Sequence, residues 1–143
     1  MPILDLPVVL QRDEFSCGAA VFACFTRYWE GRGRKLKSHP HYGTHPDVLE
    51  MAFHAAGYHV LAGVMDLEQL KYTTGRGWPV ACLVKSDGEG HWVGVRGVRR
   101  NRVYLMDPAD GLTDVPAADW LAAWSDFDRR GTVFRQYGLA VHC

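Results

Sequence analysis

The sequence predicts an α+β fold in which an N-terminal helical lobe packs on a C-terminal antiparallel sheet. Two observations lead to this prediction. The first half carries apolar stretches of helical length with helix-capping residues at their ends, whereas the second half changes to short runs rich in Val, Leu, Trp and Tyr. Because helices precede strands along the chain, we expect two lobes with a cleft between them.

The composition describes a globular chain without a strong charge. Its 143 residues fit one compact domain, which we expect to span residues 1–143. Lys plus Arg and Asp plus Glu both number 16, so the charge gives no reason to expect a nucleic-acid or anionic-membrane partner. We expect the chain to act as a monomer.

Neither a membrane span nor a signal peptide is expected. No stretch approaches the ~18 apolar residues of a transmembrane helix, and Met1–Pro7 lacks the basic and apolar regions of a signal peptide. We therefore expect a cytoplasmic protein whose four cysteines are reduced thiols. No two of them have Cys-x-x-Cys spacing, so neither a structural zinc site nor a redox pair is indicated.

The first helix is expected after an extended arm at Leu4–Leu10. It begins at Ser16 or Cys17, runs to Trp29 and is apolar on nearly every face, which is typical of a buried central helix. The side-chain oxygen of Ser16 is expected to accept from the free N–H groups of the first turn.

A second helix is expected from about Pro46 to Ala56, because proline suits a first turn and Gly57 suits the position after a helix end. A third, short helix follows Asp66 and reaches Tyr72. The buried face of the second helix is expected to consist of Val48, Met51, Ala52 and Ala55.

The second half of the chain is expected to contribute the sheet. Two short loops, at 86–90 and 99–101, separate three strands, and a short helix and a last strand follow. The expected strands are Trp78–Lys85, His91–Val98, Arg102–Met106 and Thr132–Val141, with the helix at Pro116–Trp124.

Cys17 is the first candidate for chemistry. A cysteine in the first turn of a helix lies near free N–H groups and the positive end of the helix dipole, and both favour the nucleophilic thiolate. Gly18 leaves room beside the sulfur for a substrate backbone. Gln11 can donate its side-chain amide to an oxyanion, together with the Cys17 backbone N–H. Taken alone, a reduced cysteine is more often a small buried apolar residue than a nucleophile.

His91 and Asp107 supply the partners that such a thiol needs. His91 follows a glycine-rich turn at the start of a strand, and Asp107 ends the next strand. A continuous hairpin centred near residue 99 would pair the two residues. The carboxylate would then fix the imidazole tautomer and leave the other ring nitrogen for the thiol. We expect the neighbouring Trp92 to form a cleft wall that contacts the substrate.

The remaining histidines do not form a recognisable metal site. His39, His41 and His45 lie close together in the sequence, but no carboxylate or thiolate spacing completes a zinc or nickel site. We expect no metal and no cofactor.

These residues also resemble those of a known family. The string Gln11-x-Asp13-x-x-Ser16-Cys17-Gly18-x-Ala20, followed by His91-Trp-Val and Asp107-Pro108-x-x-Gly111, resembles the papain-like peptidases that cut bacteriocin leaders after a double glycine. These form family thirty-nine of the clan CA cysteine peptidases, best known as the N-terminal domain of bacteriocin-exporting ABC transporters. The segment that starts at Gly43-Thr44 is also similar to the second helix of the family.

The resemblance spans nearly the whole chain and implies a papain-like fold. It also implies Cys17 as nucleophile, His91 as base, Asp107 as the orienting acid and Gln11 as oxyanion donor. Ser16 stands where the exporters of the family usually carry aspartate, and no transporter follows in this sequence.

Three functions remain open. The first is a cysteine peptidase that forms a thioester on Cys17 and cuts a peptide or a leader-bearing precursor, with an ABC exporter in trans as a further partner. The second is a transpeptidase or amide-forming acyltransferase, in which an amine replaces water. The third is a papain-like module that binds a leader peptide without cutting it. The presence of all four site residues favours an enzyme over the third function.

Overall fold

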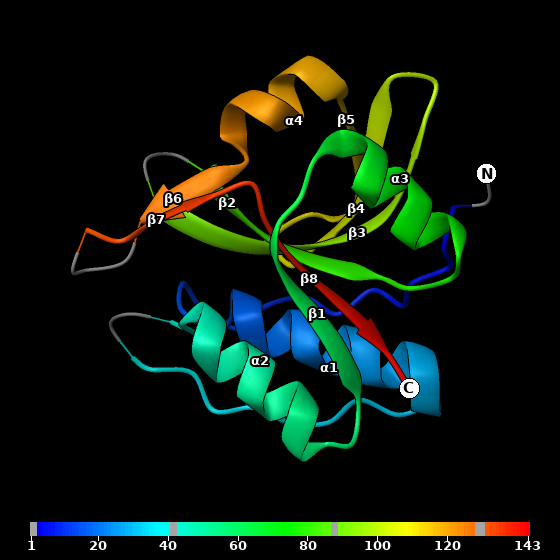
Figure 1. The fold of residues 1–143 in the computed structure, drawn as a ribbon. Coiled ribbons are helices and arrows are strands. Elements are labelled where there is room, and N and C mark those ends of the chain that lie inside the picture. Colours follow the sequence, from blue (N-terminus) through cyan, green and yellow to red (C-terminus); the bar gives the residue numbers. More distant parts are fainter. Residues whose placement is uncertain (1–2, 41–42, 87–88, 128–130) are drawn as a thin grey trace.

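The computed structural model describes residues 3–40, 43–86, 89–127 and 131–143 (Figure 1). Of the helices in these ranges, none is long and apolar enough to cross a membrane. The helices are α1 (Cys17–Glu30), α2 (Pro46–Ala55), α3 (Leu67–Gly75) and α4 (Ala117–Ala123). The strands are β1 (His59–Val64), β2 (Val80–Ser86), β3 (Glu89–Arg99), β4 (Arg102–Asp107), β5 (Gly111–Pro116), β6 (Ser125–Phe127), β7 (Val133–Arg135) and β8 (Tyr137–His142).

One antiparallel sheet organises the chain. Its strand order is β1-β8-β2-β3-β4-β5, and every neighbouring pair runs antiparallel. β6 and β7 form a separate two-stranded ribbon. The late strand β8 therefore lies between two strands that come much earlier in the sequence. This arrangement confirms the predicted α+β class with an antiparallel sheet.

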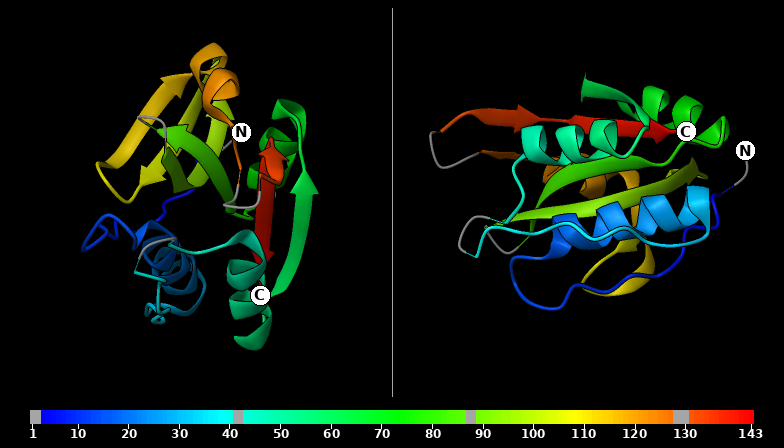
Figure 2. Two further views of the ribbon diagram at one scale, coloured as in Figure 1. Left: turned by 90° about the vertical axis from the view of Figure 1, so that its left-hand side faces the viewer. Right: turned by 90° about the horizontal axis from the view of Figure 1, so that it is seen from below.

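Helices cover both faces of the sheet (Figures 1 and 2). α1 packs along β3 and α2 lies beside β1, whereas α3 and α4 lie on the opposite side. Trp92 and Val93 are neighbours in β3 yet belong to different cores, because successive side chains of a strand point to opposite faces. The predicted helical lobe thus corresponds to α1 and α2, and the two shorter helices close the other face.

The segment before α1 is extended, as predicted, and lies along β3. Leu4 and Leu6 are buried in the core under α1. The Leu4 N–H donates to the Arg96 carbonyl at 2.8 Å, and the Arg96 guanidinium donates to the Leu4 carbonyl at 3.0 Å. These two bonds fix the arm that leads toward Gln11.

α1 begins at Cys17, as the sequence predicts, but Ser16 does not cap it in the expected way. The Ser16 hydroxyl oxygen accepts from the N–H groups of Arg12 and Asp13, at 2.9 and 3.1 Å. The serine therefore closes the loop in front of the helix. The first-turn N–H groups of α1 are left without a side-chain acceptor among the described residues.

The buried face of α2 differs from the prediction. Its inward residues are Pro46, Leu49 and Phe53, and the Phe53 ring packs on two aromatic rings of α1, with centroid distances of 4.8 and 5.9 Å. Leu49 and Phe53 are four residues apart, so they fit one face of a helix as well as the predicted set does. Periodicity alone therefore selected the wrong side of α2. Three members of the expected stripe are exposed, namely Val48, Met51 and Ala55.

Some strands differ from the sequence prediction. β1, β5 and β6 were not expected, and the side chains of β1 are mostly exposed, which removes the alternating pattern that marks a strand. The expected strand at 132–141 is divided into β7 and β8. Gln136 between them has a φ of 49°, a left-handed conformation that interrupts the ladder.

The β3–β4 hairpin is centred between residues 100 and 101, and not near residue 99. Both of these residues have positive φ, 54° and 62°, as a two-residue hairpin turn requires. A bulge at 95–97 then shifts the register, so that Gly94 pairs with Met106. The same register sets Asp107 level with Val93, two residues from His91. The predicted direct pairing of His91 with Asp107 was wrong, but a diagonal pair on one face still lets the side chains meet.

The two sides of α2 give opposite expectations for truncation. Leu49→Ala removes a fully buried side chain and is expected to lower the free energy of unfolding by about 2–5 kcal/mol. Val48→Ala, on the exposed side, is expected to change it by less than about 0.5 kcal/mol. Urea unfolding followed by circular dichroism measures both values. A larger loss for Val48→Ala would contradict the assigned face of α2.

Candidate active site

Cys17 lies where the start of α1 meets the beginning of β3. Its side chain is buried, with 6% exposure. The backbone N–H of Trp92 donates to Cys17 Sγ across 3.4 Å. A thiolate is a stronger hydrogen-bond acceptor than a neutral thiol.

The imidazole of His91 is held by Asp107. Nε2 of His91 lies 2.7 Å from Oδ1 of Asp107, and the two side chains are 14% and 18% exposed. The same Oδ1 accepts from the N–H of Ala109 at 2.9 Å, which anchors the carboxylate in the turn after β4. Because Nε2 faces the carboxylate, Nδ1 is the ring nitrogen left for the thiol of Cys17.

The surroundings of His91 and of Asp107 both favour the charged form of the side chain. Burial disfavours the imidazolium, but the hydrogen bonds of His91 with Asp107 and Cys17 outweigh it and raise the pKa of His91 to about 9. Burial also opposes ionisation of Asp107, yet the bonds from His91 and from the Ala109 N–H lower the pKa of this carboxyl below its ordinary value. An imidazolium at neutral pH stabilises a neighbouring thiolate.

Gln11 lies in the loop that leads into α1. Its backbone N–H donates to the carbonyl of Pro108 at 2.9 Å, which ties this loop to the turn after Asp107. Its side-chain Nε2 donates to the Asp13 carbonyl at 2.7 Å. Oε1 is buried without a hydrogen-bond partner in the described part of the chain. The amide nitrogen carries two hydrogens, so one remains to donate to a bound group.

Gly18 and Trp92 have surroundings different from those expected. A Cβ on Gly18 would lie 2.6 Å from Cβ of Thr44 and 3.1 Å from Cδ1 of Trp92, so protein already fills that space. Trp92 is 2% exposed, and its Nε1–H donates to the Thr44 carbonyl at 2.8 Å. Gly18 and Trp92 therefore both pack against Thr44 inside the protein, and their expected contact with a substrate stays a prediction.

Thr44 is the residue near the site that the sequence did not single out for a role. Its contact with Trp92 uses a backbone carbonyl, which every residue carries, so no residue type marks it. The sole signal was the Gly43-Thr44 pair within the family resemblance.

The other three cysteines differ from Cys17 in their surroundings. All four are free thiols, and Cys143 is exposed. Burial raises the pKa of Cys24 to about 12, and its Sγ donates to the Pro7 carbonyl at 3.2 Å. Burial also raises the pKa of Cys82 well above its ordinary value. Cys24 and Cys82 are therefore protonated packing residues.

The histidine cluster of the sequence is only partly described. His41 lies outside the described residues, and His45 accepts from the Asp47 N–H at 3.1 Å at the start of α2. Within the described ranges, no group of three His, Cys, Asp or Glu side chains could hold a metal ion.

A pocket of about 240 Å³ opens beside His91 and Asp107. Trp120 of α4 also lines it, and the Nε1–H of this residue is buried without an acceptor among the described residues. The apolar part of its wall includes Val84, Val93, Leu105 and Val115, and its polar part includes Lys85, Ser86 and Asp119. A pocket of this kind suits an apolar side chain of a bound peptide.

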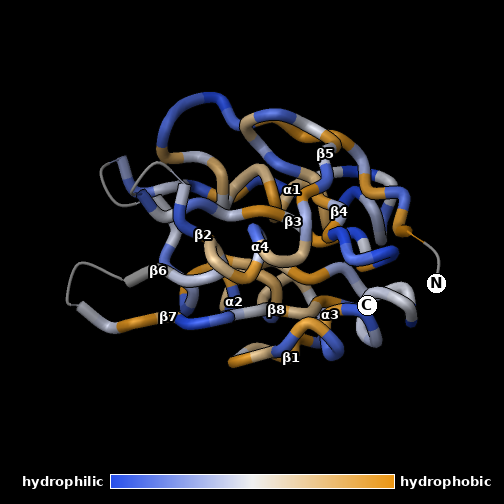
Figure 3. Tube along the Cα trace, turned by 90° about the horizontal axis from the view of Figure 1, so that it is seen from above, coloured by the Kyte–Doolittle hydropathy of each residue, from blue (hydrophilic) through white to orange (hydrophobic). Residues whose placement is uncertain are grey.

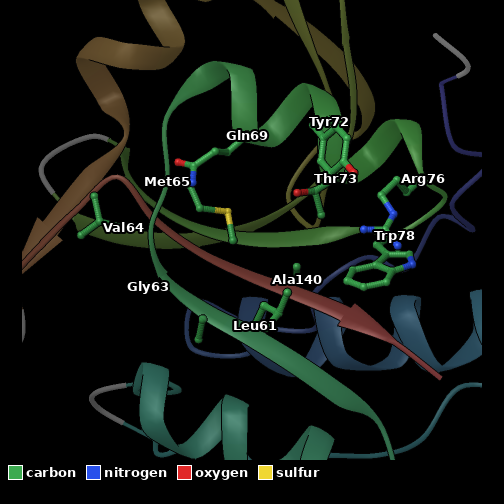
Figure 4. A pocket seen from close by; sticks show the side chains of 11 residues that line it. Leu61, Gly63, Val64, Met65, Gln69, Tyr72, Thr73, Arg76, Trp78 and Ala140 are labelled. Carbon is green, nitrogen blue, oxygen red and sulfur yellow. The ribbon is translucent and has the colours of Figure 1, made fainter.

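A second pocket, of about 360 Å³, lies between β1, β8 and α3, and its lining includes none of the site residues (Figure 4). The Arg76 guanidinium lies over the Trp78 ring at 4.6 Å and over the Tyr72 ring at 5.6 Å. β1 carries hydrophobic residues along one edge of the molecule (Figure 3), where Leu61 and Val64 are exposed.

A thiol, an imidazole and a carboxylate held in this order are the parts of a nucleophilic acyl-transfer site. The family model described as the peptidase C39 family matches residues 5–127 of the sequence. The chain belongs to the peptidase C39 family. It is therefore a cysteine peptidase by family, and the resemblance seen in the sequence is confirmed.

Solved structures share the fold of this C39 chain. A double glycine motif protease from an AMS/PCAT transporter, in complex with the leader peptide, matches with a TM-score of 0.72 and 19% identity, over 97% of this chain and 92% of its own. The peptidase domain of Streptococcus mutans ComA, in complex with a small-molecule inhibitor, gives 0.72 and 18% over 96% and 99%. A C39-like peptidase from Bacillus anthracis gives 0.73 and 15% over 99% and 97%.

These similarities confirm the papain-like α+β fold predicted from the sequence. A comparison with curated proteins finds no match.

The raised pKa of His91 can be measured directly. In the parent chain its imidazole is expected to titrate at about pH 9. Asp107→Asn removes the anionic acceptor, so the pKa of His91 is expected to fall toward its ordinary value of about 6.5. Because the folded-state pKa of His91 lies above the unfolded one, the stabilisation from the raised pKa of His91 is full below about pH 6.5 and is lost as the pH rises through about 9.

Heteronuclear NMR of the imidazole signals follows this titration. Asp110→Asn, which changes an exposed carboxylate three residues further on, is the matched control and is expected to leave the pKa of His91 unchanged. Equal pKa values in the parent, Asp107→Asn and Asp110→Asn would contradict the assigned contact.

Proposed function

We propose that this chain hydrolyses a peptide bond through a thioester on Cys17. The Cys17 sulfur, ionised beside the His91 imidazolium, attacks the carbonyl carbon. His91 then gives its proton to the leaving amine, and a water molecule that loses a proton to the same imidazole releases the acyl group. Asp107 holds the ring with Nδ1 toward the sulfur. The observation that carries this proposal is the 2.7 Å contact between His91 and Asp107 beside the Cys17 thiol.

We assign oxyanion binding to the Cys17 backbone N–H and the Gln11 side-chain amide. Two observations support this assignment. Ser16 does not cap α1, so no serine oxygen competes for the first-turn N–H groups. The Gln11 loop is bonded to the turn after Asp107, which keeps the donor and the orienting acid in one region. Such donors act on the charge that develops in the transition state.

The proposed substrate is a precursor peptide whose leader is cut after a double glycine. The support comes from one similar structure, a double glycine motif protease in complex with the leader peptide. The largely apolar pocket beside His91 and Asp107 offers a place for an apolar leader side chain. An ABC exporter in trans would then receive the matured product, and the reaction would take place in the cytoplasm, where thiols stay reduced.

Selective alkylation tests whether Cys17 is activated. At about pH 6 an ordinary thiol is almost fully protonated, whereas a thiolate paired with an imidazolium reacts. Cys143 is exposed and serves as the reference for an accessible thiol without activation, whereas Cys24 and Cys82 are buried. Iodoacetamide followed by peptide mapping is expected to modify Cys17 well before the other three thiols. Labelling of Cys17 and Cys143 at one rate would count against an activated Cys17.

A synthetic precursor with a central Gly-Gly tests the reaction and the oxyanion donor. Mass spectrometry is expected to find one cut after the second glycine and none with Cys17→Ala. Gln11→Ala is expected to lower kcat by about 10²–10³-fold, whereas Glu14→Ala, an exposed change in the same loop, leaves it unchanged.

The same assay separates the alternatives. An adduct with an added amine in place of the hydrolysed product would show acyl transfer, and tight binding without turnover would show a binding module. An unaltered kcat in Gln11→Ala would remove this residue from the mechanism.

A further inference from the structure

Thr44 connects the two residues that flank the proposed nucleophile and base. Gly18 follows Cys17 in α1, and Trp92 follows His91 in β3. The carbonyl of Thr44 accepts from Trp92 Nε1–H at 2.8 Å, and its side chain occupies the space where a Cβ on Gly18 would come within 2.6 Å. One residue in the segment before α2 therefore contacts a neighbour of each reacting group.

This contact is buried on all sides. Thr44 and Trp92 are both shielded from solvent, and the indole packs edge-on to Tyr137 with a centroid distance of 6.2 Å. A hydrogen bond in such surroundings has no water to replace its acceptor, so breaking it leaves an unpaired N–H. The indole is therefore fixed in direction as well as in place.

The contact between Thr44 and Trp92 affects the distance between β3 and the start of α1, which Asp107 does not set. Asp107 orients the ring of His91 from β4, a strand of the same sheet. The separation between β3 and the start of α1 depends instead on what lies between them. The residues that meet there are Gly18, Trp92 and Thr44.

We infer that Thr44 and Trp92 are positioning residues whose contact sets the separation of Cys17 and His91. This inference rests on the proposed function, because it assumes that the two groups react as an ion pair. The rate of a reaction that needs both groups depends steeply on their geometry, since a misplacement of about 1 Å can lower a rate by roughly 10²-fold.

Trp92→Phe tests the inference because it removes the indole N–H and keeps an aromatic ring. Trp124→Phe is the matched control. Trp124 is also fully buried, and its Nε1–H donates to the Tyr137 carbonyl at 2.9 Å, but it belongs to the core on the other face of the sheet. Alkylation of Cys17 is followed from about pH 5 to about pH 9, together with kcat, KM and Tm.

Trp92→Phe is expected to lower the rate of Cys17 alkylation near pH 6 by about tenfold or more and to move its pH dependence toward that of an ordinary thiol. It is also expected to lower kcat with little change in KM. Trp124→Phe is expected to lower Tm and to leave the alkylation profile unchanged. An unchanged profile in Trp92→Phe would overturn the inference.

A second pair of variants keeps the test valid if Trp92→Phe does not fold. Gly18→Ala forces a methyl group against Thr44 and is expected to lower the alkylation rate. Gly18→Ala combined with Thr44→Gly removes that clash and is expected to restore most of the rate. Equal rates for the single and the double variant would overturn the inference. A failure of the proposed function would give a different result, because the parent chain itself would then show no preferred alkylation of Cys17.

Discussion

The close packing of α1 on β3 is the constraint on which the rest of the structure depends. A Cβ on Gly94 of β3 would lie 2.8 Å from the Phe25 ring of α1, and one on Gly18 of α1 would lie 3.1 Å from Cδ1 of Trp92 in β3. A Cβ at either position would press on a packed side chain, so glycine permits the closest approach of helix and strand. The approach brings the first residue of α1 to the beginning of β3, and so places Cys17 Sγ against the Trp92 N–H.

Burial has opposite consequences for thiols that lie in the same small protein. Burial is the largest influence on Cys24 and Cys82, and it keeps both sulfurs protonated. Cys17 is also buried but lies beside His91, whose positive charge is maintained by Asp107. The interior therefore contains one small region of paired charge next to two neutral cores, and the proposed reaction is assigned to that region.

The parts of this fold that could be predicted are marked by short patterns in the sequence. The start of α1 at Cys17 follows from an apolar helical run, and His91 and Asp107 follow from polar residues at strand ends. The hairpin register could not be predicted, because its turn is formed by Arg100 and Asn101 without a glycine, and a bulge adds a further shift. Thr44 was missed because its contact with the indole uses a backbone carbonyl.

The position of β8 has a consequence for the timing of synthesis. This strand pairs with β1 on one side and β2 on the other, and Leu139 and Val141 complete the core around α1. Pairing over such long sequence distances comes late in folding. A nascent chain on the ribosome cannot close this core before residue 142 has left the exit tunnel.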